Sequence, residues 1–383
     1  MKKHLATLLF VSLMMSLLAI CALAQGVQSV ELHGFMQNRF YANPDSSARF
    51  VAERVSLSAV GKFGTDAIGY VEVYYHPWLT DRVIGVPQPT PPVTGYTAEQ
   101  SRIYLESAYA DLPAGEGRLR IGKGRQLNFG LTPTYPNRKT SQYGIISETF
   151  TQDRIVGAQY TQKIGSFDFG GSLYTDQRVQ NRKIGDFAGA SVNQLMPSTK
   201  VVAHIVDKDD PANNPGTLAG SVRFGITKPD YQVHLSGASG KMVEEDVAVL
   251  NTAFGIQSQS TSRKHQKYGL DAAVARGPFC LQTEYYQGKF SFLTITGYQV
   301  LLGYQPKDKI RGYVRWSALS NGSMNNRTAS QLTWPTRQFT VGIIKPLRPG
   351  MWVELDYEKN METTAGLPKP KNDLLFLELF TGF

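Results

Sequence analysis

The sequence predicts an all-β fold, a transmembrane antiparallel β-barrel with short periplasmic turns and long extracellular loops. Three observations predict it: an alternating final segment, an export signal at the start, and no later apolar run near the roughly 20 residues of a membrane helix. We expect sixteen strands, with fourteen or eighteen as the alternatives.

The last segment, residues 372–383, alternates in polarity and ends on an aromatic residue. Leu375 and Leu379 share one face, whereas Glu378 lies on the other. A carboxylate inside an otherwise apolar run suits a strand with lipid on one side and water on the other. The terminal Phe383 on such a strand resembles the insertion signal of bacterial outer-membrane barrels.

The first residues have the pattern of a secretory signal peptide. A basic start (1–4) precedes an apolar run (5–20) and the small-x-small cleavage site Ala22-Leu23-Ala24. We therefore divide the chain into a cleaved signal peptide, 1–24, and a barrel domain, 25–383, and expect the mature protein in the bacterial outer membrane.

Other interpretations of this segment are a membrane-anchoring helix and a lipoprotein, although Ile20 is too large for the usual residue before a lipid-bearing Cys21. Removal of Lys2 and Lys3 lowers the formal charge from +9 to +7 and leaves Cys280 as the sole cysteine. An intramolecular disulfide and a cysteine-based metal site are thereby excluded. Any structure that crosses the membrane must be a closed barrel, because lipid cannot satisfy open sheet edges.

Sixteen segments show the period-two alternation and the length of roughly 9–11 residues expected of barrel strands. They are 28–41, 50–63, 66–77, 100–112, 117–126, 153–163, 166–176, 217–228, 230–240, 266–276, 279–289, 294–305, 308–319, 336–346, 350–360 and 372–383. Tight turns alternate with long polar segments, which are 78–99, 127–152, 177–216, 241–265, 320–335 and 361–371. Within 177–216, residues 200–206 are either an additional strand or part of a structured loop.

Alternation places apolar residues on one face of each strand and charged residues on the other. The outward set in three strands is Val55, Leu57, Ala59, Phe63, Ile310, Val314, Trp316, Val353, Leu355 and Tyr357. The inward set is Arg54, Ser56, Ser58, Lys62, Arg311, Tyr313, Arg315, Glu354, Asp356 and Glu358. An Arg or Lys facing lipid at the midplane costs about 2–4 kcal/mol, so these charges are expected to face water. A barrel of about sixteen strands leaves an aqueous channel.

Basic residues are the candidates for pore lining and anion contact. They are Arg54, Arg102, Arg118, Arg120, Arg125, Arg138, Lys139, Arg154, Arg223, Arg311 and Arg315. Rings of Arg and Lys in a pore favour anions, and the planar fork of arginine suits phosphate or carboxylate. Acids of inward parity make the lumen mixed; they are Glu72, Glu106, Asp168, Asp271, Glu284, Glu354, Asp356 and Glu378. Pairing with these acids, which braces the barrel wall, is the alternative role for each arginine.

The segment 127–152 is the third outer loop, counting the connection between 28–41 and 50–63 as the first, and it carries Arg138 and Lys139, with Arg125 and Arg154 at its flanks. In sixteen-stranded porins a loop at this position commonly folds into the lumen and narrows it. The alternative is a solvated surface loop.

Several segments resemble the phosphate-selective porin O and P family. They are Phe50–Phe63, Leu105–Leu112, Leu119–Leu131, Asp153–Tyr160 and Thr283–Tyr286, with the best match over 50–175 and 279–289. The usual proline before Phe129 is replaced by Asn128, so the resemblance does not fix the loop conformation there. The resemblance implies a trimeric, sixteen-stranded pore that conducts small anions.

We therefore expect a passive diffusion channel and no enzyme. The chain has no Gly-x-Ser-x-Gly, His-Glu-x-x-His, Walker or dinucleotide motif, and no spacing that suggests a metal site. Expected partners are outer-membrane lipid, small anions or hydrophilic solutes and two further copies of the chain; no cofactor and no nucleic acid are expected. One alternative is a substrate-specific channel for an organic acid or sugar, with an aromatic track of Tyr104, Tyr174, Tyr286 and Tyr313. The other is a barrel enzyme with a His–Ser pair among His33, His76 or His234.

Overall fold

The computed structural model describes most of the predicted barrel domain. The described residues are 27–43, 46–64, 66–76, 102–131, 140, 143–151, 154–176, 178–183, 191–192, 203–208, 217–253, 260–307, 309–321, 335–363 and 372–383. The predicted signal peptide, 1–24, lies outside them, as do Arg138 and Lys139. Within the described part of the chain, no helix is both long and apolar enough to cross a membrane.

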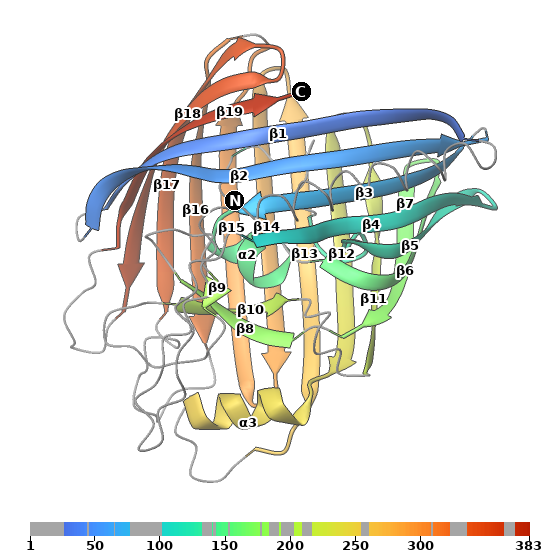
Figure 1. The fold of residues 1–383 in the computed structure, drawn as a ribbon. Coiled ribbons are helices and arrows are strands. Elements are labelled where there is room, and N and C mark those ends of the chain that lie inside the picture. The colour runs from blue at the N-terminus through green and yellow to red at the C-terminus, as the bar shows by residue number, and fades with distance from the viewer. Residues whose placement is uncertain are drawn as a thin grey trace, which may run out of the picture.

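Sixteen strands form one closed antiparallel barrel, so the predicted fold class and strand number are confirmed (Figure 1). The strands are β1 (Val27–Asn43), β2 (Ser46–Phe63), β3 (Ala67–His76), β4 (Arg102–Ala114), β5 (Gly117–Arg125), β6 (Arg154–Ile164), β7 (Phe167–Thr175), β11 (Leu218–Thr227), β12 (Tyr231–Lys241), β13 (Lys264–Arg276), β14 (Phe279–Phe290), β15 (Leu293–Tyr304), β16 (Arg311–Asn321), β17 (Thr336–Arg348), β18 (Met351–Glu362) and β19 (Leu374–Gly382). Each of the sixteen predicted segments corresponds to one of these strands.

The first and last strands close the barrel. β1 pairs with β2 on one side and with β19 on the other, where Arg39 lies opposite Glu378. The backbone N–H of Gly34 donates to the oxygen of Phe383 at 2.8 Å, and the N–H of Phe383 donates to the oxygen of Gly34 at 2.9 Å. Closure leaves no open sheet edge, as a span through lipid requires.

The described residues of the segment 177–216 contribute no strand to the barrel. β8 (Arg178–Lys183), β9 (Ser191–Val192) and β10 (Ala203–Lys208) form a separate sheet in the order β10-β8-β9. β7 and β11 pair directly with each other across this insertion. Residues 203–206 are therefore an extra strand that belongs to a structured insertion and not to the barrel, and residues 200–202 lie outside the described part.

The wall has an apolar outer face and a polar inner face, as the alternation predicted. Along β18, Leu355 and Tyr357 are exposed, while Glu354, Asp356 and Glu358 are buried. Exposed apolar side chains occur on strands all around the barrel, from Val30 on β1 to Leu379 on β19. An apolar band of this extent is typical of a lipid-facing surface.

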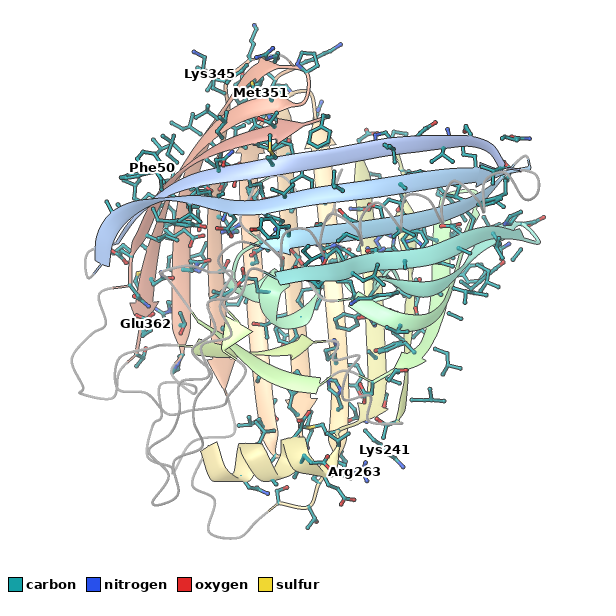
Figure 2. All side chains as sticks on the ribbon, viewed as in Figure 1. Phe50, Lys241, Arg263, Lys345, Met351 and Glu362 are labelled. Carbon is teal, nitrogen blue, oxygen red and sulfur yellow. The ribbon has the colours of Figure 1, made fainter. Side chains whose placement is uncertain are left out.

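The two rims differ in their connections. Tight turns carry glycines in the left-handed region, such as Gly64 (φ 56°) and Gly350 (φ 74°), where a Cβ would be strained. Lys345 lies near this rim, whereas Lys241 lies at the opposite end of the barrel (Figure 2). The helix α3 (Glu244–Ala253) follows β12 at that opposite rim (Figure 1).

Candidate constriction of the lumen

The segment that follows β5 folds into the barrel. It contains the helix α2 (Ile145–Phe150), whose six residues are all buried. α2 contacts the inner side of β14, β15 and β16, and also contacts β10 (Figure 1). The predicted lumen position of the loop 127–152 is therefore found in its described residues, and the surface-loop alternative is wrong.

The start of this loop is fixed to the inner wall of β6 and β7. The backbone N–H of Leu127 donates to the Gln159 Oε1 at 2.7 Å. The Asn128 amide donates to the carbonyl oxygens of Tyr160 at 3.0 Å and Gly171 at 2.9 Å, and it lies 2.9 Å from the Ser172 hydroxyl. Asn128 thus holds the chain where the family pattern has proline.

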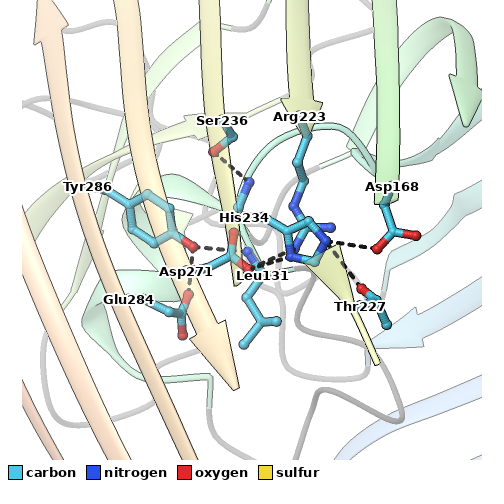
Figure 3. Close-up of polar contacts among 10 residues, drawn as sticks. Leu131, Asp168, Arg223, Thr227, His234, Ser236, Asp271, Glu284 and Tyr286 are labelled. Carbon is cyan, nitrogen blue, oxygen red and sulfur yellow. Dashed lines mark hydrogen bonds and ion pairs between the residues drawn. The ribbon is translucent and has the colours of Figure 1, made fainter. Parts of the chain in front are cut away.

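The loop then crosses to β12 and β14. The N–H of Gly130 donates to the Ser236 Oγ at 3.1 Å, and the N–H of Leu131 donates to the Tyr286 hydroxyl at 3.0 Å (Figure 3). Gly130 has a φ of 64°, and a Cβ there would lie 2.6 Å from the Tyr286 hydroxyl. The Tyr286 hydroxyl in turn donates to Glu284 at 2.8 Å. Glycine is therefore required for this close approach.

An apolar cluster fixes α2 against β14 and β15. Inward glycines on these strands make room for the helix, since a Cβ at Gly297 would lie 2.7 Å from the Ile146 Cδ1. A Cβ at Gly288 would lie 3.1 Å from the Phe150 ring. The buried members of the cluster are Phe129, Ile145, Ile146, Phe150, Ala238, Met242, Val247, Leu250, Tyr286, Phe290, Leu293, Ile295 and Leu319. Burying one large apolar side chain stabilises by about 1.5–3 kcal/mol, so this cluster holds the loop strongly.

The loop spans the lumen between opposite walls. The Arg125 guanidinium, at the end of β5, donates to the Tyr143 hydroxyl at 3.1 Å. The next residue, Gly144, is so close to β16 that a Cβ there would lie 2.8 Å from the Arg315 Nε. β5 and β16 are eight positions apart in the ring of sixteen strands. The turn at Tyr143–Gly144 therefore bridges the barrel across its width.

Arginines gather on the wall near β5. Arg154 forms an ion pair with Glu106, and the Arg125 guanidinium lies 4.0 Å from the same carboxylate. The guanidinium carbon of Arg54 lies 5.0 Å from the centre of the Tyr74 ring. Three of the predicted basic residues thus lie beside the loop, with the carboxylate of Glu106 paired to two of them.

Carboxylates gather on the adjacent strands β18 and β19, and β18 lies six positions from β5 in the ring of strands. Glu354, Asp356 and Glu358 occupy alternate inward positions of β18, and Glu378 on β19 lies opposite Glu354. The Arg315 guanidinium donates to Glu358 at 3.2 Å, and the Tyr313 hydroxyl donates to Asp356 at 2.5 Å. The lumen is therefore mixed in charge, and acids and arginines pair within the same stretch of wall, as Glu358 does with Arg315 and Glu378 with Arg39.

The other predicted basic residues are distributed over the inner wall. Arg118 and Arg120 both bind Asp111, at 2.5 and 2.9 Å. Arg223 donates to Asp271 at 2.7 Å. Arg311 is half-buried at the start of β16. Arg102 begins β4, and its side chain falls outside the described part, as do Arg138 and Lys139.

His234 lies in a network of wall contacts. Its Nε2 lies 3.1 Å from the Asp168 carboxylate and 3.3 Å from the Thr227 hydroxyl, while its Nδ1 lies 3.0 Å from the Arg223 guanidinium (Figure 3). A histidine that activates a hydroxyl nucleophile binds the hydroxyl and the carboxylate through different ring nitrogens. Here the Asp168 and Thr227 oxygens share Nε2, while the Asp271 carboxylate lies 3.6 Å from Nδ1, beyond hydrogen-bonding distance, so the network does not have the geometry of a catalytic triad.

Sequence reasoning missed the residues that hold the loop. The ammonium of Lys267 lies 4.9 Å from the centre of the Phe129 ring and is buried, and Ser236 accepts from the loop backbone. The available signal was glycine at inward positions of long strands, at Gly288 and Gly297, since inward glycine leaves space for another segment.

Comparisons with known proteins agree with this architecture. Residues 241–328 match the family model for phosphate-selective porin O and P. The resemblance found in the sequence is therefore confirmed for 279–289. The other resembling region, 50–175, lies outside the matched residues. No curated protein sequence matches the chain.

Three solved structures share the fold. OmpF of Salmonella typhi, in complex with daunomycin, is 11% identical with a TM-score of 0.61, covering 92% of this chain and 97% of its own. The anion-selective porin of Comamonas acidovorans is 12% identical with a TM-score of 0.54, covering 93% and 99%. The trimer form of OmpT of Vibrio cholerae is 11% identical with a TM-score of 0.52, covering 93% and 99%. The chain therefore has the porin fold.

Replacing Asn128 with alanine is expected to loosen the start of the loop. The variant loses the hydrogen bonds to Tyr160 and Gly171, each worth about 0.5–1.5 kcal/mol. Single-channel recordings should then show larger current fluctuations than the wild type, because the loop leaves the wall more often. Gln162→Ala is the matched control, since that amide binds Glu116 on the exposed rim. Equal current noise in the two variants would contradict the anchoring role of Asn128.

Proposed function

We propose that this protein is an outer-membrane porin, a water-filled channel through which small hydrophilic solutes and ions diffuse passively. The observation that carries the proposal is a loop that bridges the lumen of a closed barrel from Arg125 on β5 to Arg315 on β16. A sixteen-stranded barrel is wide enough for water, and a loop inside it sets the size of the passage. The porin fold and the family match over 241–328 support the same conclusion.

The passage is proposed to follow the half of the lumen opposite α2. The loop's described hydrogen bonds and apolar contacts reach β5–β7, β12 and β14–β16. The inner faces of β17–β19 and β1–β4 then form the wall of the open side. Solutes on this route pass between the arginines near β5 and the carboxylates of β18.

We propose a preference for anions at the narrowest point. Arg54 and Arg125 lie beside the loop turn, and Arg125 contacts the loop through Tyr143. Guanidinium groups at a constriction favour anions. The acids of β18 oppose this preference, but two of them, Asp356 and Glu358, are bound to Tyr313 and Arg315.

The test is the reversal potential of the refolded protein in a planar bilayer under a KCl gradient. We expect a stable conductance with a potential biased toward chloride. Arg54→Gln/Arg125→Gln should move the potential toward potassium, because it removes two cations and leaves the Arg154–Glu106 pair intact. Lys345→Gln is the control, since it removes a charge at the rim. A potential biased toward potassium in the wild type would overturn the anion preference, and no conductance would overturn the channel.

We further propose that the protein is a homotrimer in the outer membrane and acts without a cofactor. We also propose that a signal peptide directs its export and is cleaved after residue 24. The trimer form of the Vibrio cholerae protein, which shares the fold, supports the oligomer. N-terminal sequencing of the mature protein and its mass in detergent by light scattering test these two points. A mature N-terminus at Met1, or a monomer mass, would overturn the corresponding part.

Two alternatives remain as proposals. A barrel enzyme is disfavoured by the geometry of His234, and lipid hydrolysis lost in a single Ser or His variant would establish it. A substrate-specific channel needs aromatic residues in the passage, but the hydroxyls of Tyr174, Tyr286 and Tyr313 are engaged by neighbouring residues. Tyr104 instead lies with Tyr74, and this pair gives the specific alternative its support.

A further inference from the structure

Arg54 differs from the other described arginines near the loop. Among the described residues, its guanidinium has no hydrogen-bond acceptor and no ion-pair partner, and its Nε is buried without a bond. Its described cation–π contact is with the Tyr74 ring, whose centre lies 5.0 Å from the guanidinium carbon. Among the described residues, the terminal nitrogens of this cation are therefore left without an acceptor.

The neighbouring carboxylates are engaged elsewhere. Glu53 accepts from the Tyr41 hydroxyl at 2.8 Å and pairs with Arg39 at 3.6 Å. Glu72 accepts from the Ser56 hydroxyl at 2.8 Å. Glu106, on β4, pairs with Arg154. Among the described residues, no carboxylate thus forms an ion pair with Arg54, although Glu53 lies near enough to act on its charge.

Tyrosines surround this cation on adjacent strands. Tyr74 lies opposite Tyr104 in the register of β3 and β4, and their ring centres are 5.8 Å apart at an interplanar angle of 64°. Tyr143, on the loop turn, lies near Arg54 and Tyr74 and binds Arg125. The rings come from β3, β4 and the lumen loop, so three separate elements bring tyrosines close to the guanidinium.

We infer that Arg54, Tyr74, Tyr104 and Tyr143 form a binding site for small aromatic carboxylates inside the channel. The inference deepens the proposed function and rests on it. A guanidinium close to a ring keeps its coplanar N–H donors, which match the two oxygens of a carboxylate. The aromatic ring of the solute then packs against tyrosine rings by edge or offset contact.

The composition of the site selects this class of solute. A phosphate ion would use the donors of Arg54 but leave the tyrosine rings without a role. An uncharged sugar would use the rings but leave the cation without a counter-charge. A benzoate-like anion uses both, because its charge and its flat apolar face lie on one rigid molecule.

The experiment measures block of the KCl current of the refolded wild-type channel by sodium benzoate, sodium acetate, inorganic phosphate and benzyl alcohol. Block is expressed as a fraction of each variant's own current. We expect benzoate to block at a concentration about ten-fold lower than acetate, since contact with aromatic rings adds to the carboxylate interaction. Equal or stronger block by acetate or phosphate would overturn the inference. Benzyl alcohol that blocks as well as benzoate would also overturn it, because the cation would then have no role.

Variants separate the two parts of the site. Arg54→Ala should weaken block by benzoate to the level of benzyl alcohol, and Tyr74→Leu should remove the advantage of benzoate over acetate while leaving acetate block in place. Arg311→Ala is the matched control, because Arg311 likewise has no described ion pair and lies on β16, five positions from β2 in the ring of strands. An equal loss in Arg311→Ala would overturn the inference. Absence of any KCl current in the wild type would refute the channel itself, whereas current without selective benzoate block refutes this site alone.

Discussion

Ile146→Ala/Phe150→Ala is expected to raise the single-channel conductance and the size limit for solutes. Both side chains are almost fully buried in the cluster that holds α2 against β14 and β15, at 0% and 2% exposure. Truncating a buried Ile or Phe costs about 2–5 kcal/mol each. A loss of this size is large compared with the hydrogen bonds at Gly130 and Leu131, so the loop should leave the wall and open the lumen.

Conductance in planar bilayers and the rate of sugar-driven swelling of proteoliposomes measure this effect. Leu250→Ala is the matched control, because Leu250 is equally buried in the same cluster but lies on α3 at the rim. We expect the control to leave the conductance near that of the wild type. An unchanged conductance in the double variant would mean that the loop is not what narrows the passage.

Arg39→Ala is expected to destabilise the barrel by about 3–5 kcal/mol. Arg39 forms an ion pair with Glu378 across the seam between β1 and β19, and the two side chains are 4% and 0% exposed. Removing one partner of a buried pair leaves the other charge uncompensated, which costs far more than the pair itself contributes. Tyr41 and Glu53 also lose their cationic neighbour.

Urea unfolding in lipid vesicles, followed by tryptophan fluorescence, measures the change. Lys62→Ala is the control, since its pair with Glu31 is nearly half exposed and should contribute little. Arg39→Met/Glu378→Leu should recover much of the loss, because it removes both charges together. Equal midpoints for Arg39→Ala and Lys62→Ala would show that the seam does not depend on this pair.

Most of the fold could be predicted from the alternation of apolar and polar residues along the strands. On β18, Glu354, Asp356 and Glu358 alternate with exposed apolar residues, and the strand lies where the alternation placed it. β16 shows the same agreement at Val314 and Arg315. A side chain facing lipid must be apolar, whereas one facing the lumen can be charged. The polarity pattern of each strand therefore predicts which of its faces points to lipid.

The contacts that build the constriction were not predictable in the same way. Gly130 binds Ser236 and Leu131 binds Tyr286, at sequence separations of 106 and 155 residues. Parity placed Arg315 in the lumen but gave no reason to pair it with Glu358 or with Thr140 on the loop. Arg54 had the same sequence signature as the other candidate arginines, yet only its surroundings set it apart.

By itself, the sequence determined that the chain makes a closed barrel, which positions face lipid, and that the segment after β5 is long enough to enter the lumen. These properties follow from local alternation and from the requirement that every backbone group be satisfied in lipid. The tertiary structure alone decided how the loop crosses from Arg125 to Arg315, and that Arg54 lies beside the Tyr74 ring. The physical reason is that closing the barrel brings together side chains that are far apart in the chain, and those pairings fix the charge and shape of the passage.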